Sequence, residues 1–429
     1  MQIEEIKKII IDQKEEIKEL FRREEIIERE LDVKKFKKFL KHPNILVISG
    51  VRRSGKSILT MLFLKGEKYG YINFDDERLV GFVKEDFNKL LQAFYELYGS
   101  DLDHFIFDEI QDIRNWEFFI NRLRRTKKVI ITGSNAKLLS GELASHLTGR
   151  YIDFTLYPFS FREFLKFKKK EFKKEDFFST KKISQIKNLL KEYIKIGGFP
   201  EVFKFGKTIV KKIYGDIINK DILFRYRIKN KNTFRELAKY LLSNFSQEIS
   251  YSKLKNIFTI RNVHTIKNYV EYLSSNFLVF VLEKFSYKLK QQAIACKKVY
   301  GIDTGLINSL SFQFSENSGK LMENAVLLEF LRQKSYFNEN LEIYFWKDYF
   351  NKEVDFILKK GRKVIQLVQV CSQVEDFNVK QRELGSLIEA SKELKCNKLL
   401  VITQDYEAEE EFKNKKIKYI PLWKWLLEK

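Results

Sequence analysis

One short stretch of the chain has the residue types and the spacing of a phosphate-binding loop. Gly50 is followed, after four residues, by Gly55, Lys56 and Ser57. The apolar run 45–48 before the loop predicts a buried strand, and apolar residues at helical spacing follow it. In such a loop, glycines let backbone N–H groups approach a polyphosphate, a lysine neutralises it, and a hydroxyl ligates Mg²⁺. The pattern predicts a nucleotide site rather than a turn that happens to precede a lysine.

The residues expected to bind the nucleotide form one continuous stretch. The helix that starts near Lys56 directs the positive end of its dipole at the same phosphates. Lys56 is the expected catalytic cation, and Ser57 is the expected metal ligand. The predicted cofactors are therefore ATP and Mg²⁺. The predicted phosphate-binding residues are Gly50, Val51, Arg52, Arg53, Ser54, Gly55, Lys56, Ser57 and Ile58.

Two carboxylates at the end of a later apolar run complete this prediction. The stretch 102–107, in which four residues are apolar, leads directly into Asp108 and Glu109. We expect Asp108 to hold Mg²⁺ through water and Glu109 to orient and polarise the attacking water as a catalytic residue. Two acids after an apolar run are common in α/β proteins, but behind a phosphate-binding loop they are a specific signal.

Polar residues at two further positions are candidates for contact with the γ-phosphate. The run 129–132 predicts a strand, and Ser134 or Asn135 after it could contact the phosphate or the attacking water; the sequence does not choose between them. A plain turn is the alternative. The stretch 136–147 predicts a helix, and Arg150 beyond it could reach a γ-phosphate of its own or of a neighbouring subunit, or form a surface ion pair.

These elements must be positioned by a sheet. Predicted strands and helices alternate through residue 155, which indicates a parallel sheet covered on both faces, with the nucleotide at the carboxyl ends of the strands. The fold class is therefore α/β, of the P-loop NTPase type. Residues 1–43, with isoleucines on one face, predict a charged helix that covers this domain.

Composition limits the class of protein and its partners. The chain has 429 residues, enough for about three domains of roughly 150 residues. Its net charge of +22 favours a polyanionic partner such as nucleic acid, although lysine-rich solvated helix faces would give the same excess. Three scattered cysteines, a charged N-terminus and the lack of a long apolar run predict a cytoplasmic protein without a membrane partner.

An ordered string of motifs resembles a known family. The segments GVRRSGKS, FIFDEIQ, ITGSNAKLLSGELASHLTGRY and LYPFSFREFL, followed by YIKIGGFPEVF and IYGDIINKDILFRY, resemble an AAA+-type P-loop ATPase family of archaea and bacteria. The resemblance covers nearly the whole chain and places a sensor at Ser134 and Asn135 and an arginine at Arg150. It implies an ATPase core (1–156), a helical lid (157–230), a winged helix (231–290) and a degenerate restriction-endonuclease-like domain (291–429).

Two segments after the core are candidate nucleic-acid surfaces. The run 167–178 interleaves lysine with phenylalanine, which indicates a strand-binding surface or, as we favour, an amphipathic helix with its rings inward. The stretch 233–287 predicts three short helices and a hairpin, as in a winged helix. Its third helix would either enter a DNA groove or pack on a neighbouring domain. The expected outward residues are Arg261, His264, Thr265, Lys267, Asn268 and Glu271.

The C-terminal region departs from the nuclease pattern that it resembles. The resemblance places Glu323 and Asp355 at the first two metal-binding positions, but Gln369 and Cys371 stand where a Glu-x-Lys pair is expected. A metal there loses a carboxylate, and the transition state loses a cation. Lys363 could replace that cation, but we expect no nuclease activity.

The preferred hypothesis is therefore an ATPase of AAA+ type that binds and hydrolyses ATP with Mg²⁺, acts on or with DNA and could form a homo-oligomer. The alternative is a nucleotide-dependent switch for protein assembly without a DNA role. A nuclease coupled to ATP is a third hypothesis.

Overall fold

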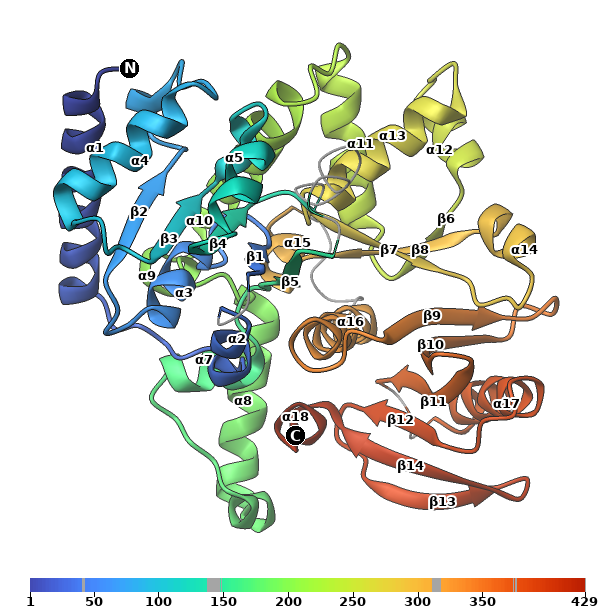
Figure 1. Ribbon diagram of the computed structural model, residues 1–429. Coiled ribbons are helices and arrows are strands. Elements are labelled where there is room, and N and C mark those ends of the chain that lie inside the picture. Colours follow the sequence, from blue (N-terminus) through green and yellow to red (C-terminus); the bar gives the residue numbers. More distant parts are fainter. Residues whose placement is uncertain are drawn as a thin grey trace. The chain divides into compact units, whose positions relative to one another are not determined.

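A computed structural model of the chain describes residues 1–40, 43–136, 147, 149–310, 318–372, 374 and 376–428 (Figure 1). The chain separates into two compact units, Met1–Leu156 and Tyr157–Lys429. None of the helices in the described residues combines the length and the apolar composition needed to cross a membrane.

The first unit is built on a parallel five-stranded sheet with the spatial order β2-β3-β4-β1-β5. Its strands are β1 (Ile45–Ser49), β2 (Tyr69–Asn73), β3 (His104–Asp108), β4 (Lys128–Gly133) and β5 (Tyr151–Thr155). Ser49 lies opposite Gly133, and Asn73 lies opposite Asp108, so the strands end at one edge. The predicted α/β fold of the P-loop NTPase type is confirmed.

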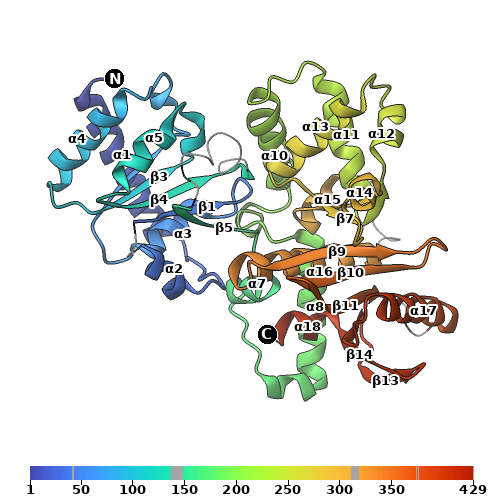
Figure 2. The ribbon, with the colours of Figure 1, turned by 45° about the vertical axis from the view of Figure 1, so that its right-hand side comes forward.

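Helices cover both faces of this sheet, as a parallel sheet requires. Figures 1 and 2 show α4 and α5 on one face and α2 and α3 on the other. These helices are α1 (Ile3–Arg23), α2 (Val33–Phe39), α3 (Lys56–Phe63), α4 (Asp86–Tyr98) and α5 (Trp116–Leu123), with two 3-10 turns, η1 (Glu77–Leu79) and η2 (Ile110–Asp112). The helix predicted over 136–147 lies almost entirely outside the described residues.

The N-terminal prediction of one covering helix is wrong in one respect. Residues 1–43 form two helices, α1 and α2, because the chain turns into extended backbone at Glu24. The first of them does cover the domain, since its buried Gln13 donates to the Asn73 carbonyl at 3.1 Å and accepts from the Asn73 N–H at 2.9 Å. Gln13 thereby pairs backbone groups at the end of the edge strand β2, which would otherwise stay unpaired.

The second unit begins with helices. They are α7 (Phe161–Phe167), a 3-10 segment η4 (Lys174–Phe178), α8 (Thr180–Ile196), α9 (Val202–Phe205), α10 (Thr208–Asp216) and a π-helical segment η5 (Ile217–Phe224). The amphipathic helix favoured for 167–178 is wrong. Lys169 adopts a left-handed φ of 54° just after α7, and no residue of η4 is buried. Phe178 is 88% exposed, so its ring does not face a core.

Three helices and a small antiparallel sheet follow. They are α11 (Lys231–Ser243), β6 (Gln247–Ile249), α12 (Tyr251–Ile257), α13 (Val263–Ser275), β7 (Val279–Glu283) and β8 (Lys297–Gly301), with α14 (Leu289–Ile294) between the last two strands. The sheet order is β6-β8-β7. The boundary expected at residue 290 therefore separates two paired strands, β7 and β8.

A mixed six-stranded sheet with the order β13-β14-β12-β11-β10-β9 forms the rest of the second unit. Its elements are α15 (Thr304–Leu310), α16 (Ser318–Tyr336), β9 (Leu341–Lys347), β10 (Glu353–Lys360), β11 (Lys363–Cys371), α17 (Phe377–Glu393), β12 (Leu399–Thr403), β13 (Ala408–Phe412), β14 (Lys415–Pro421) and α18 (Leu422–Leu427). Alternate residues of β10 face two cores: Phe356 packs in the cluster of α16, and Ile357 packs in that of α17.

A buried carboxylate joins α15 to the turn after α8. Asp303 accepts hydrogen bonds from the Gly198 N–H at 2.5 Å and the Leu306 N–H at 2.8 Å. The close approach requires glycine at position 197, where a Cβ would meet Asp303 Oδ1 at 2.1 Å. Burial raises the pKa of Asp303 to about 6, although these N–H groups stabilise the charged form.

This shift predicts a pH-dependent contribution to stability. A carboxyl that binds its proton more tightly in the folded state lowers the free energy of unfolding as pH rises from about 4 to above about 6. The wild type should lose roughly 3 kcal/mol over that range through Asp303. Asp303→Asn should lack this loss. Urea unfolding of both proteins at about pH 4 and about pH 7 measures it. An equal difference between the two proteins at both pH values would refute the shift.

Candidate functional site

The phosphate-binding loop follows β1 with the backbone that its glycines permit. Gly50 has a φ of 148°, and a Cβ there would meet the Leu156 carbonyl oxygen at 2.3 Å, so only glycine fits. Gly55 has a φ of 93° and stands directly before α3. Arg53 also adopts a positive φ, of 66°, and the loop is thereby folded tightly between β1 and the N-terminus of α3. That N-terminus carries partial positive charge and suits an anion.

Lys56 is buried at the centre of the loop. Its ammonium donates to the carbonyl oxygens of Gly50 at 3.2 Å and Val51 at 3.4 Å. It also forms an ion pair with Glu109 Oε1 at 3.2 Å. The predicted catalytic cation and the predicted catalytic carboxylate are therefore in direct contact, although 53 positions separate them in the chain.

Asp108 is fully buried at the end of β3 and accepts from three hydroxyls. Tyr71 donates to its Oδ2 at 2.8 Å, Thr132 donates to its Oδ1, and the Ser57 hydroxyl also bonds to this carboxyl group. Burial and the charge of Glu109 raise the pKa of Asp108, and the three hydroxyls act in the opposite direction. The contact with Ser57 brings together the two residues predicted to serve the metal.

This pair fits a magnesium ion. Mg²⁺ prefers oxygen ligands and keeps several of its waters, so one hydroxyl and one carboxylate are a sufficient protein contribution. Ser57 would supply the hydroxyl and Asp108 the carboxylate, directly or through water. A magnesium ion held there would supply positive charge next to bound phosphates.

Glu109 is held in a single orientation by groups from three elements. Its Oε2 accepts from the Ser134 N–H at 3.1 Å and from the Gln111 side chain at 2.6 Å. Burial disfavours the charged form, but the charge of Lys56 and the hydrogen bond from Gln111 lower the pKa of Glu109 to about 2. Glu109 therefore stays ionised at neutral pH, as a group that polarises water must be.

Ser134 and Asn135 follow β4 at the same edge of the sheet, and both are buried. The Ser134 hydroxyl finds no hydrogen-bond partner within the described residues. A buried hydroxyl without a partner is unfavourable unless a ligand or water supplies one. The Ser54 hydroxyl of the loop is also buried and also finds no hydrogen-bond partner within the described residues.

Arg150 does not join this group of side chains. It precedes β5, whose Tyr151 lies opposite Ile45, the first residue of β1, whereas the loop follows the last residue, Ser49. Five strand residues span about 13 Å, so Arg150 lies beside the amino-terminal ends of β1 and β5, whereas the loop follows the carboxyl end of β1. Its exposed guanidinium donates to Asn121 Oδ1 at 3.2 Å. The hypothesis that Arg150 reaches the phosphate of its own subunit is therefore wrong.

Three residues of the site were not predicted. Thr132 donates to Asp108 and accepts from the Glu109 N–H at 3.1 Å, and Tyr71 also donates to Asp108. Both lie in predicted strands, and the alternation of strand side chains could have placed them on one face. Arg29 is buried and donates to the Ser54 carbonyl at 2.8 Å. Nothing local distinguishes Arg29 from the other charged residues of its segment.

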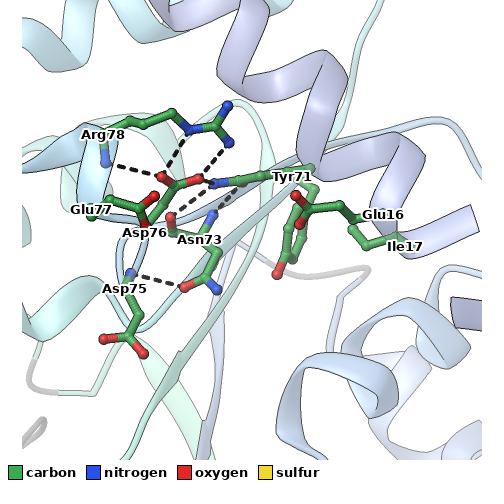
Figure 3. A pocket seen from close by; sticks show the side chains of 9 residues that line it. Glu16, Ile17, Tyr71, Asn73, Asp75, Asp76, Glu77 and Arg78 are labelled. Carbon is green, nitrogen blue, oxygen red and sulfur yellow. Dashed lines mark hydrogen bonds and ion pairs between the residues drawn. The ribbon is translucent and has the colours of Figure 1, made fainter. Parts of the chain in front are cut away.

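A polar pocket of about 470 Å³ lies beside the site, where β2 ends against α1 (Figure 3). Its lining includes Glu16, Asp75, Asp76 and Glu77, and Arg78 donates to Asp76. The hydrogen bond from Arg78 helps to lower the pKa of Asp76 to about 2. Because these carboxylates would repel a triphosphate, this pocket is not the nucleotide site.

Family models match three consecutive parts of the chain. Residues 42–165 match the model described as an AAA domain. Residues 187–317 and 318–425 match two domains of unknown function, DUF8612 and DUF4143. The first match and the parallel sheet identify the first unit as an AAA-type P-loop ATPase fold, which implies nucleotide binding. The match to the C-terminal region gives no support for a nuclease.

Similar proteins span nearly the whole chain. An uncharacterized protein of Methanocaldococcus jannaschii is 36% identical over 95% of this chain and 93% of its own length. An uncharacterized protein of Haemophilus influenzae is 30% identical over 88% of this chain and 94% of its own length. Among solved structures, a Walker-type ATPase of Pyrococcus abyssi has 15% identity and a TM-score of 0.42, covering 67% of this chain and 97% of that chain.

The bond from Arg29 to the loop yields a test. Arg29→Met should leave the Ser54 carbonyl unpaired and loosen the loop, which should weaken nucleotide binding by roughly 5- to 10-fold. Titration with a fluorescent ATP analogue measures the affinity. Arg23→Met is the matched control, because Arg23 is 75% exposed and pairs only with Glu19 of its own helix among the ion pairs of the described residues. Equal affinities for the two variants would refute the role of Arg29.

Proposed function

The chain belongs to the same family as its relatives from Methanocaldococcus jannaschii and Haemophilus influenzae, and from that premise we propose that it binds ATP with Mg²⁺ and hydrolyses it. The observation that carries this proposal is the meeting of two pairs at one edge of the sheet. Ser57 contacts Asp108, and Lys56 contacts Glu109. In this proposal, the first pair would hold the metal, Lys56 would bind phosphate, and Glu109 would act on water.

Each residue has a separate role in the proposed reaction. ATP enters the loop, and Lys56 exchanges its bonds to the Gly50 and Val51 carbonyls for bonds to phosphate oxygens. Ser57 and Asp108 would hold Mg²⁺, which would supply positive charge for the transferred phosphoryl group. Glu109, released from Lys56, orients a water in line with the γ-phosphate and polarises it.

The sensor is assigned to Ser134 in this proposal. Its buried hydroxyl has no partner in the described part of the chain, while its N–H holds Glu109. A hydroxyl in this position would bond to the γ-phosphate or to the attacking water. Arg150 would act only on the nucleotide of a neighbouring copy, because its own phosphate-binding loop lies at the other edge of the sheet.

The hydrolysis proposal predicts different effects for two substitutions. Lys56→Ala should weaken ATP binding and lower the hydrolysis rate at least about 100-fold, because phosphate charge loses its cation. Glu109→Gln should retain or tighten ATP binding, since Lys56 is released, but lower kcat by roughly 10²- to 10⁴-fold. Phosphate release measures the rate, and a fluorescent ATP analogue measures the affinity.

The control for these variants is Lys65→Ala, which removes an exposed lysine shortly after α3 and should leave the rate unchanged. Removal of Mg²⁺ with EDTA should abolish hydrolysis by the wild type. Equal rates for the wild type, Lys56→Ala and Glu109→Gln would reject the proposal.

We further propose that the ATPase acts on or with DNA through a winged helix formed by α11 to β8. The element order α11-β6-α12-α13-β7-β8, with the sheet order β6-β8-β7, supports this assignment. On α13, Ile266, Tyr269 and Val270 are buried, whereas Lys267 and Asn268 are exposed. The net charge of +22 adds long-range attraction to a polyanion.

The competing function is a nucleotide-dependent switch for protein assembly. It uses the same loop, requires only slow hydrolysis and has no DNA role. Under that function, α13 packs on a partner protein instead of entering a groove. The dependence of DNA binding on salt separates the two functions, because each neutralised phosphate adds about 0.9 to the slope of log K against log salt.

DNA binding through α13 predicts a specific change in this slope. Arg261→Ala with Lys267→Ala should weaken binding to duplex DNA and lower the slope by about 2, if each side chain contacts one phosphate. Fluorescence anisotropy at several salt concentrations measures both quantities. Lys360→Ala with Lys363→Ala removes the same charge from exposed positions elsewhere and is the control. Undetectable binding by the wild type at low salt would favour the assembly switch.

A further inference from the structure

A buried ammonium lies among carboxylates in the second unit. Lys298, on β8, is 3% exposed. Its Nζ is 2.9 Å from Glu323 Oε1 on α16, 3.1 Å from Asp355 Oδ1 and 2.5 Å from Glu353 Oε1, both on β10. The Tyr300 hydroxyl donates to the same Glu323 oxygen at 2.6 Å. One lysine therefore joins three carboxylates from two elements distant in the chain.

Two of these carboxylates are those that the nuclease resemblance assigned to a metal. Glu323 and Asp355 do lie together, as that resemblance implied, but the ammonium stands between them. Mg²⁺ requires its oxygens at 2.0–2.1 Å, and an ammonium bonded to both carboxylates leaves no place for the ion. Within the described residues, no three His, Cys, Asp or Glu side chains are grouped so that they could hold a metal. The site as folded does not fit a divalent cation.

The remaining residues of the expected metal site serve other contacts. Gln369 donates to Glu383 Oε2 at 2.6 Å and accepts from the Asp355 N–H at 3.3 Å. Asp355 Oδ2 accepts from the Val370 N–H at 2.9 Å. Lys363, which could have replaced the missing lysine of the pattern, is exposed at the start of β11. The cation at the carboxylates comes instead from β8, outside the C-terminal sheet.

The Lys298 ammonium compensates part of the negative charge of the carboxylates around it. Burial alone would lower the pKa of Lys298, but Glu323 and its neighbours raise it well above its ordinary value, so the amine stays charged. The three carboxylates outnumber the two cations that face them within the described residues, because Glu353 is also 3.8 Å from the Lys347 ammonium. A doubly charged cation would compensate them better.

We propose that Lys298 is the resident cation of a latent divalent-metal site and closes that site to metal ions. The ammonium occupies the position between Glu323 and Asp355 that an ion such as Mg²⁺ or Mn²⁺ would take. The three carboxylates are spaced around an ammonium, and without it they would close in on a hard divalent cation, which binds through oxygen. The wild-type domain therefore binds no metal at this position.

A purely structural ion pair makes a different prediction. In that case, loss of Lys298 only destabilises the unit, because buried carboxylates are left uncompensated, and no metal affinity is gained. The proposal requires a gain of binding that a structural role alone does not produce.

The test is a Mn²⁺ titration of nucleotide-free protein, followed by the electron paramagnetic resonance signal of free Mn²⁺. Lys298→Met should bind one more Mn²⁺ per chain than the wild type and should melt at a higher temperature when Mn²⁺ is added. Lys298→Met with Asp355→Asn should lose this extra ion. Lys298→Arg, which keeps the charge, should bind no more than the wild type. Binding at Ser57 and Asp108 is common to all four proteins and cancels.

Two outcomes would overturn the proposal. One is a folded Lys298→Met protein without the additional ion, which would leave a structural ion pair only. The other is an Asp355-dependent Mn²⁺ ion in the wild type, which would show an open metal site. The second comparison uses the wild type and Asp355→Asn alone, so the closure of the wild-type site is tested even if Lys298→Met does not fold.

Discussion

The contact between Ser57 and Asp108 depends on the parallel alignment of β1 and β3. Parallel strands end at one edge of a sheet, so residues far apart in the chain meet there. The same edge holds two adjacent carboxylates in a buried setting, and burial alone would neutralise both. Hydroxyls surround Asp108, whereas a cation and N–H donors hold Glu109. The pKa values of the two acids are therefore shifted in opposite directions: that of Asp108 is raised and that of Glu109 is lowered.

Because their pKa values are shifted in opposite directions, Asp108 and Glu109 are suited to different roles before any ligand binds. A carboxyl that keeps three hydroxyl donors gains from a divalent cation, because the cation favours its charged form. A carboxylate that is already ionised can polarise water without first losing a proton. Since Glu109 and the loop carbonyls bind Lys56, phosphate must replace these contacts. In the proposed reaction, this exchange would free Glu109 only when the loop is filled, which would couple occupancy of the loop to readiness for hydrolysis.

The sequence was sufficient where the signal is local. Glycine spacing, a lysine and a strand ending in two acids predicted the positions of Lys56, Ser57, Asp108 and Glu109, and periodicity predicted most of the strands. The sequence was insufficient where the conformation of a segment or the position of a side chain depends on contacts formed only in the folded chain. The helix expected over 167–178 was wrong, because α7 ends before the left-handed Lys169 and only a 3-10 segment follows, a break that the spacing of phenylalanines does not reveal. Arg29 has no local signature, since only folding brings its side chain to the loop.

Lys298 is the clearest case of a residue that only the fold reveals, and comparison with Lys56 shows why the two lysines behave differently. Lys56 is bonded to one carboxylate and two neutral carbonyl oxygens, which an incoming phosphate can replace. Lys298 is bonded to three carboxylates, and no neutral ligand or anion replaces that attraction. Only a cation can compete with it, and the competitor must also displace a covalently tethered ammonium with a high effective concentration. A tethered cation therefore closes its site permanently, whereas a lysine on neutral carbonyls leaves its loop open to a ligand.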